Sequence, residues 1–323
     1  MGSICLIFCA TGHVGSAAAA YVLEYGHYDI VRLTTRRPES LQNKTMTINS
    51  KTRLEVVTCD LNSEEDIRRA FSGGVKSVFL ITPDDFFDNE WLDKIRVTIQ
   101  YYASAVRAAV KKGSLDRIVC LSTIGAQLLE DAGDLSVSGE LEDVITDAAS
   151  DRCVEVICIR PGYFFSNFRT ELSEALSTGV MTTQMPEDAR FPCQAPQDVG
   201  KRVGKALVQP FYPVSDAHGN SNMSKKTVIQ FAFPTLYSVG DVARILQEIT
   251  GKYIHLHILS ESEWRSILEA AGYPPRRVQS LVEMSNCIAT GRAQFDPSDG
   301  KIEKATTSLE EYLNEFVEED VRV

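Results

Sequence analysis

The sequence has no run of about 18 consecutive apolar residues, the length that a membrane-spanning helix needs. Long runs of lysine and arginine are also missing: the 323 residues include 33 basic and 44 acidic ones, and the net charge is −11. Because nucleic-acid binding needs clustered cations, this charge argues against a nucleic-acid partner. The N-terminus, Met1-Gly2-Ser3-Ile4, lacks the basic region of a secretory signal. We therefore expect a cytoplasmic protein that binds neither nucleic acid nor membrane.

The eight cysteines form no C-x-x-C pair and no zinc-finger spacing. Most of them lie in apolar runs, where a free thiol packs as a small hydrophobic group. We therefore predict reduced cysteines, as is usual in the cytosol. His255 and His257 would lie on one face of a strand, but no cysteine or carboxylate is in register with them, so we predict no metal site.

Short apolar runs alternate with helical patterns in the first half of the chain. Such runs, rich in β-branched residues, are typical of buried strands in a parallel sheet. Successive right-handed βαβ units then predict an α/β fold with a doubly wound parallel Rossmann sheet. The expected strands are 4–8, 30–35, 54–57, 78–81, 117–121 and 154–159, and the expected helices are 13–25, one from about residue 63, 89–111 and 139–149.

The alternation stops after Arg160-Pro161-Gly162. We predict helices at 164–178, 198–208, 238–250, 260–271 and 275–287, strands at 228–233 and 254–259, an irregular segment at 182–196 and an exposed loop at 218–226. Thr307-x-x-Glu310 predicts a capping box for the last helix. We therefore expect a Rossmann domain over residues 1–165 and a smaller mixed α/β domain over 166–323 that covers the substrate, with 196–233 returning to the Rossmann core.

A glycine motif, Cys9-Ala10-Thr11-Gly12-His13-Val14-Gly15, follows the first predicted strand. Gly12 lets the backbone approach a pyrophosphate, and Gly15 lets the helix pack against the sheet. The free N–H groups and the dipole at the helix start attract phosphate. The motif therefore predicts a dinucleotide site, with Cys9 in place of the first glycine. If that position has a positive φ, the Cβ of Cys9 is strained.

The second predicted strand ends with Thr35-Arg36-Arg37-Pro38. An NAD enzyme usually has Asp or Glu there to bind the ribose hydroxyls. Arg36 can instead bind a 2′-phosphate and stack on adenine, which favours NADP(H) as the cofactor.

These segments together resemble the NmrA-like family of atypical short-chain dehydrogenases. The matching segments are A-T-G-x-x-G (10–15), T-R-R-P (35–38), D-L (60–61), V-F-L-I-T-P (78–83), L-S-T-I-G-A (121–126) and R-P-G-Y-F (160–164) with Asn167. The resemblance implies NAD(P) binding and a substrate cleft above the nicotinamide. The cofactor residues that we expect are Thr11, Gly12, His13, Val14, Gly15, Thr35, Arg36, Arg37, Asp60, Leu61, Ile81, Thr82, Pro83, Ser122, Ser138, Pro161, Gly162 and Tyr163.

The chain departs from the wider superfamily at the catalytic pair, because no Tyr-x-x-x-Lys occurs in it. When Glu142 is aligned with the family's helix glutamate, the Lys position falls on Ser138 and the Tyr position on Asp134. Thr123 then fits the position of the catalytic Ser. An ordinary alcohol–ketone dehydrogenase is therefore not expected. The candidate catalytic residues are Asp134, Thr123 and Tyr163, with Asp84 and Asp85 as further candidate acids.

Three functions fit a cofactor site without that pair. The first is a tailoring enzyme of specialised metabolism that transfers a hydride to an activated C=N or C=C of an apolar, nitrogen-containing small molecule, since placement alone can accelerate such a step. The second is a redox-neutral cyclase or isomerase, and the third is a regulator that senses NADP(H). Aromatic residues near the predicted cleft favour an enzyme: Phe86, Phe87, Trp91, Tyr163, Phe164, Phe165 and Phe168. A monomer and a homodimer both remain open.

Overall fold

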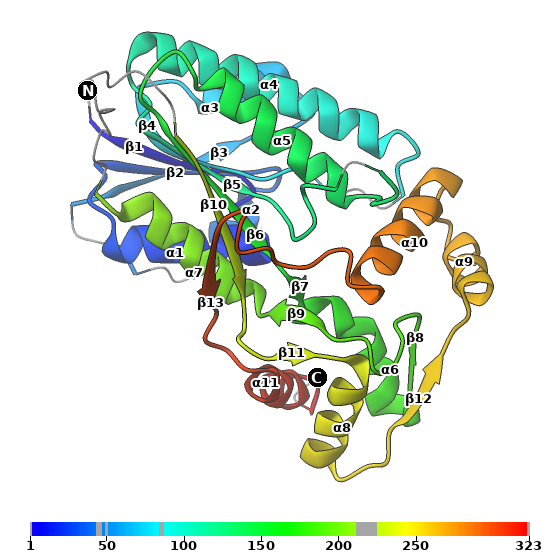
Figure 1. Ribbon diagram of the computed structural model, residues 1–323. Coiled ribbons are helices and arrows are strands. Elements are labelled where there is room, and N and C mark those ends of the chain that lie inside the picture. The colour runs from blue at the N-terminus through cyan, green and yellow to red at the C-terminus, as the bar shows by residue number, and fades with distance from the viewer. Residues whose placement is uncertain are drawn as a thin grey trace.

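The computed structural model describes residues 2–42, 47–48, 51–83, 87–128, 130–210 and 225–321. Its centre is an eight-stranded sheet with the order β13-β10-β6-β5-β4-β1-β2-β3, and neighbouring strands run parallel (Figure 1). The predicted doubly wound Rossmann sheet is therefore confirmed. β1 and β4 are neighbours at its centre, where the strand order reverses, and such a point opens a crevice at the carboxyl ends of the strands.

The first half of the chain follows the predicted alternation. Its elements are β1 (Ile4–Ile7), α1 (His13–Tyr25), β2 (Ile30–Thr35), α2 (Glu39–Gln42), β3 (Arg53–Thr58), α3 (Glu64–Ala70), β4 (Val75–Leu80), α4 (Trp91–Lys112), β5 (Arg117–Leu121), α5 (Leu135–Ala148) and β6 (Glu155–Pro161). Only the short helix α2 has no counterpart among the predicted elements.

The second half contributes to the main sheet and to two small ones. Its elements are β7 (Tyr163–Phe164), the 3-10 helix η1 (Phe165–Phe168), α6 (Arg169–Thr178), β8 (Val180–Thr183), β9 (Phe191–Gln194), α7 (Pro196–Val208), β10 (Lys225–Ala232), β11 (Leu236–Tyr237), α8 (Val239–Thr250), β12 (His255–Ile258), α9 (Glu261–Ala270), α10 (Pro275–Ala289), β13 (Lys301–Lys304) and α11 (Leu309–Val321). β11, β9 and β7 form one small sheet, and β12 pairs with β8 in the other.

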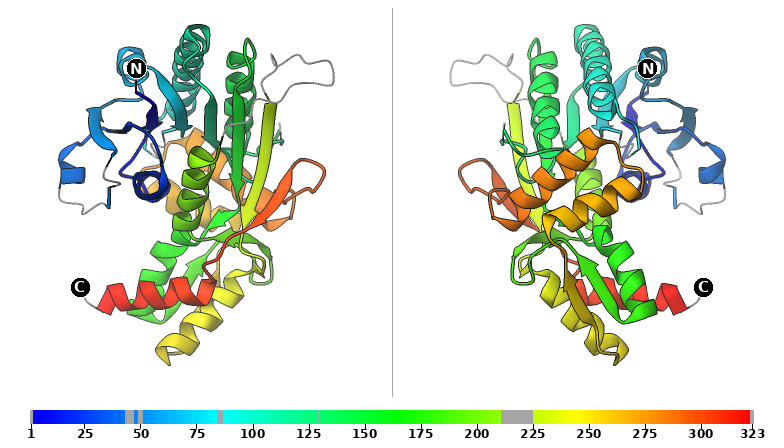
Figure 2. Two further views of the ribbon diagram at one scale, coloured as in Figure 1. Left: turned by 90° about the vertical axis from the view of Figure 1, so that its left-hand side faces the viewer. Right: turned by 90° about the vertical axis from the view of Figure 1, so that its right-hand side faces the viewer.

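Helices cover both faces of the main sheet (Figure 2). α3, α4 and α5 pack on one face in a core that includes Ile67, Ile99 and Leu141. α1 and α7 pack on the other, around Ala18 and Val203. A third core joins η1, α6, α8, α10 and α11 below the sheet.

Several predictions for the second half need correction. The helix predicted at 164–178 begins at Arg169, after β7 and η1, and the strands β8 and β11 were not predicted. The segment 182–196 is not irregular throughout, because residues 191–194 are fully enclosed and form β9. Lys225 and Lys226 belong to β10 and not to a loop, whereas residues 218–224 of that predicted loop lie outside the described residues. The capping box lies one residue later than predicted: Ser308 N–H bonds the Glu311 carboxylate, and Glu311 N–H bonds the Ser308 hydroxyl. β13 was not predicted, because its sequence KIEK carries little apolar signal.

Candidate functional site

The glycine loop after β1 brings the start of α1 directly under the sheet edge. A Cβ on Gly15 would lie 2.2 Å from the carbonyl oxygen of Cys9, so only glycine allows this packing. Gly12 caps α1 without any side-chain hydrogen bond, which leaves the helix start available to a ligand. Cys9 has a φ of 51°, which confirms that the position requires a positive φ. The chain therefore tolerates backbone strain where the motif usually has glycine.

A cavity of about 340 Å³ opens above this loop, at the carboxyl ends of β1, β2, β3 and β4. Predicted cofactor residues from all four strand ends line it: Thr11, Gly12, Thr35, Arg36, Arg37, Asp60, Leu61, Ile81, Thr82 and Pro83. Trp91, one of the aromatic residues expected near the cleft, lines the cavity from the start of α4. Four further lining residues were not predicted: Asn62, Asp88, Lys94 and Ile95. His13, Val14 and Gly15 lie at the helix start beside the loop, outside the lining.

The electrostatics of this cavity are set by cations at its rim. Arg36 and Arg37 are exposed, and neither forms an ion pair with another described residue. Lys94 is paired with Asp88. The Thr35 hydroxyl accepts a hydrogen bond from Arg37 N–H at 3.1 Å and lies 3.4 Å from the Thr11 hydroxyl. No carboxylate occupies the end of β2, so the rim there is suited to an anion.

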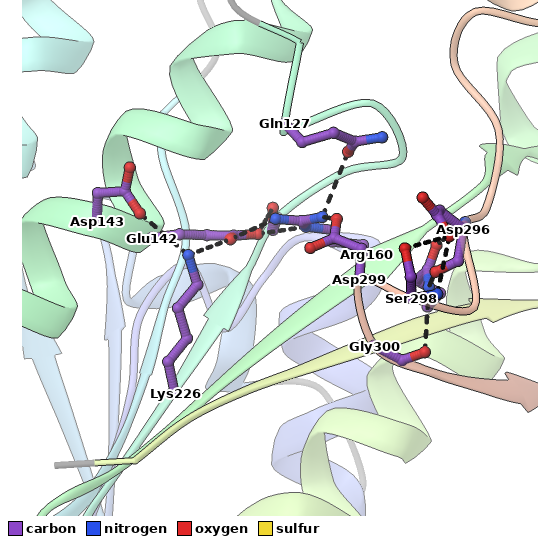
Figure 3. A network of polar contacts seen from close by, with 11 residues as sticks. Gln127, Glu142, Asp143, Arg160, Lys226, Asp296, Ser298, Asp299 and Gly300 are labelled. Carbon is purple, nitrogen blue, oxygen red and sulfur yellow. Dashed lines mark hydrogen bonds and ion pairs between the residues drawn. The ribbon is translucent and has the colours of Figure 1, made fainter.

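The ends of β5 and β6 carry a buried ionic network around Glu142 (Figure 3). The Glu142 carboxylate, fully enclosed, accepts from Arg160 Nε and Nη2 at 2.7 Å, from the Ser122 hydroxyl at 2.5 Å and from Lys226 Nζ at 2.9 Å. Arg160 also bonds Asp299. Although burial opposes ionisation, the hydrogen bonds from Arg160 and Ser122 hold the pKa of Glu142 below its ordinary value. Ser122 is thereby turned toward α5.

The turn after β6 is fixed by a side chain that the sequence did not identify. Gln194, fully buried in β9, accepts from Gly162 N–H and donates to Gly162 C=O, both at 3.0 Å. A Cβ on Gly162 would lie 2.3 Å from the Pro192 carbonyl oxygen. Ile124 N–H also bonds the Pro161 carbonyl at 2.8 Å. The backbone of Pro161 and Gly162 is therefore held rigidly beside the end of β5.

Tyr163 follows this turn and belongs to the lower core. Its ring contacts Phe168 and Phe191, with centroids 5.2 and 5.4 Å away. Burial and the nearby Glu171 raise the pKa of Tyr163, while a hydrogen bond with Asn167 opposes them. The hydroxyl therefore stays protonated at neutral pH. Burial also raises the pKa of Glu171 to about 7.

Asp134 lies away from the cofactor cavity, in a junction between α5 and α10. Its carboxylate bonds Arg277 and the Ser280 hydroxyl. The Arg277 guanidinium also stacks on Trp91, 4.2 Å from the ring centroid. Because its oxygens are engaged in this way, Asp134 holds two helices together in the structure.

The remaining predicted residues are spread over the neighbouring elements. Thr123 and Ser138 are half-buried, the first after β5 and the second on α5, and neither lines the 340 Å³ cavity. Asp84, Asp85 and Phe86 lie outside the described residues. The eight cysteines are free thiols. Within the described ranges no helix is both long and apolar enough to cross a membrane, and no three metal-ligating side chains cluster.

Known proteins are similar to this chain over nearly its whole length. The model of the NmrA-like family matches residues 1–313. No curated protein sequence gives a significant match. The structure is similar to triphenylmethane reductase from Citrobacter sp. complexed with NADP(H), with a TM-score of 0.71, 18% identity and coverage of 98% of this chain and 100% of the other. It is also similar to an NADPH-dependent quinone oxidoreductase from Escherichia coli complexed with NADPH, with a TM-score of 0.70, 18% identity and coverage of 98% and 99%.

Proposed function

Because this chain belongs to the NmrA-like family, we propose that it is an NADP(H)-dependent oxidoreductase that works without a Tyr-x-x-x-Lys pair. The observation that carries the proposal is the rim of the 340 Å³ cavity, where Arg36 and Arg37 follow β2 and no carboxylate takes the place used for ribose hydroxyls. A guanidinium at this place can bind a 2′-phosphate through two N–H groups.

The residues present fit the cofactor. The tight contact of Gly15 with Cys9 brings the start of α1 under the cavity, and Gly12 leaves that start open for a pyrophosphate. Thr35, Arg36 and Arg37 would hold the 2′-phosphate end. The similar triphenylmethane reductase and quinone oxidoreductase structures were solved as complexes with NADP(H) and NADPH, which supports the same choice here.

Hydride transfer would depend on how precisely the protein positions the nicotinamide and the substrate. Bound NADPH supplies a hydride from C4 of its nicotinamide. The ends of β5 and β6 would position the nicotinamide, because the Glu142 network and Gln194 fix Ser122, Pro161 and Gly162. Ser138 on α5 would approach the ribose in place of the lost lysine. A rigid platform of this kind reduces the entropy cost of aligning donor and acceptor.

A weak protein acid suits only an activated acceptor. Tyr163, which stays protonated, and Thr123 would donate hydrogen bonds to the substrate, whereas Asp134, engaged with Arg277, would only hold the walls of the cleft. An iminium or a conjugated C=C accepts a hydride with little more help than such a hydrogen bond. We therefore propose an apolar, nitrogen-containing substrate and a role as a cytoplasmic tailoring enzyme of specialised metabolism.

The test uses NADPH deuterated at C4 and a panel containing a cyclic iminium, a quinone and a triphenylmethane dye. We expect NADPH oxidation with at least one acceptor and deuterium in its reduced product. Turnover without net loss of NADPH would indicate the cyclase or isomerase instead. If no acceptor reacts and the nucleotide state instead switches binding to a protein partner, the enzyme proposal is wrong and the sensor replaces it.

A further inference from the structure

A second hollow, of about 540 Å³, lies next to the cofactor cavity. It is bounded by the start of α4, the segment before α5, and α10, whose nearby positions are visible in Figure 1. Trp91 lines both hollows. The volume lies within the range of small-molecule sites, about 300–1,000 Å³.

The walls of this hollow are joined by buried contacts. Arg277, only 1% exposed, bonds Asp134 and stacks on Trp91, so α10 is attached to both α4 and α5. Arg276 pairs with Asp93 on α4 at 3.1 Å. A site whose walls are already connected loses little entropy when a ligand binds.

Both apolar groups and carboxylates line the hollow. Leu92 and Pro275 provide most of the apolar surface, and the nearly buried Trp91 and Ala132, 3% and 2% exposed, lie beneath it. The hollow is also lined by Asp131 and Glu283.

These two carboxylates form no ion pair with any residue in the described ranges. Glu283 accepts a hydrogen bond from the Gln279 amide at 2.6 Å. Arg292 lies beside Asp131 but bonds its backbone carbonyl, at 3.2 Å. The basic residue in the lining, Arg276, is already paired with Asp93. The charge that remains available to a ligand is therefore negative.

We propose that this hollow is a separate binding site for an organic cation with a flat aromatic body. The body would pack against Leu92 and Pro275, next to the edge of Trp91, and the positive nitrogen would lie toward Asp131 and Glu283. The inference goes beyond the proposed function, because the site lies outside the cofactor cavity and needs no turnover. If the reductase proposal also holds, the site would keep a nitrogen-containing substrate close to the cofactor.

Trp91 can report ligand binding through its fluorescence, and the chain has only one other tryptophan, Trp264, to remove. The variant Trp264→Phe leaves Trp91 as the single indole. We would saturate this variant with NADP⁺ and titrate it with N-methylquinolinium, following Trp91 emission and the heat of binding. Saturable quenching with the cofactor bound is expected. Displacement of the cation by NADP⁺, or no saturable binding at millimolar concentrations, would overturn the proposal.

The charge requirement is tested with matched probes and variants. The neutral 1-methylnaphthalene and the anionic naphthalene-1-sulfonate should bind more weakly than the cation by calorimetry. Asp131→Asn and Glu283→Gln should each weaken cation binding about twofold to fivefold, the size of one exposed ionic contact. Asn also tolerates the φ of 48° at residue 131.

Glu269→Gln is the control, since this exposed carboxylate on α9 gives the same change in net charge outside the hollow. It should leave the affinity unchanged. Equal affinities for all three probes, or equal effects of all three variants, would contradict the proposal. NADPH affinity, measured on the same samples, separates this result from a failure of the reductase proposal.

Discussion

The carboxyl edge of the main sheet differs between its two halves. At the ends of β1, β2 and β3 it is open, and Arg36 and Arg37 are exposed without ion pairs among the described residues. At the ends of β5 and β6 it is closed, since Ser122 and Arg160 bond the buried Glu142 and Gly162 bonds Gln194. The open half thus has cations available for a ligand, whereas in the closed half the polar groups are hydrogen-bonded to other groups of the protein.

This difference indicates how the chain can dispense with the usual catalytic pair. Charged groups bonded to each other stabilise a fixed geometry but supply no proton. In this account the open half provides affinity for the cofactor, and the closed half provides position. Substitutions in each half should therefore change different quantities.

The largest effect is expected from Glu142→Gln, which removes the charge at the centre of the closed half. The buried Arg160 would lose its main partner and keep only Asp299, at a cost of about 3–5 kcal/mol in the free energy of unfolding. Lys226, which is 29% exposed, would keep Asp143. Denaturant unfolding measures this loss.

The matched control is Glu140→Gln on the same helix. Glu140 pairs with Arg96 at the surface, where both side chains are about two-fifths exposed. Its loss should cost under about 1 kcal/mol. If the two variants unfold alike, the buried network does not hold the closed half.

A smaller, pH-dependent effect is expected from Glu171→Gln beside Tyr163. Burial raises the pKa of Glu171 from 4.5 to about 7, so the folded protein binds a proton more tightly than the unfolded chain. The wild type therefore loses stability as pH rises through this window, by up to about 3 kcal/mol in total, and the glutamine variant does not.

The measured quantity is the difference in unfolding free energy between Glu171→Gln and the wild type, which should grow in favour of the variant from pH 5 to pH 8. Glu269→Gln, which changes an exposed carboxylate, should show a flat difference. A difference that does not change with pH for Glu171→Gln as well would show that the Glu171 carboxylate is solvent-exposed.

The smallest effect concerns the open half, where Cys9 has a φ of 51°. Cys9→Gly removes the Cβ that strains this position, whereas Cys9→Ala removes only the thiol. We expect the glycine variant to be more stable than the alanine variant by about 1 kcal/mol in thermal or denaturant unfolding. An alanine variant of equal or greater stability would show that the loop is not strained.

The sequence predicts the open half better than the closed half, for a physical reason. The open half depends on local features: a glycine spacing and the residues directly after a strand. Those positions can be read from neighbours in the chain. Lys94 and Ile95 were not predicted as lining residues, because they reach the cavity from a later helix, α4.

The closed half is built from distant residues. Lys226 reaches Glu142 from β10, and Gln194 reaches Gly162 from a strand of four residues within a segment predicted to be irregular. The position of the missing tyrosine falls on Asp134, but its partner Arg277 is far along the chain and has no local signal. Pairings of this kind depend on the packed fold and leave no local pattern.

The central claim is that Arg36 in the open half selects NADP(H), and calorimetry tests it directly. NADPH should bind the wild type more tightly than NADH, and Arg36→Ala should lower the NADPH affinity by about tenfold, as expected for loss of a charge-assisted contact, while leaving the NADH affinity nearly unchanged. NADH binding as tight as NADPH, or equal losses for both nucleotides in Arg36→Ala, would contradict this account.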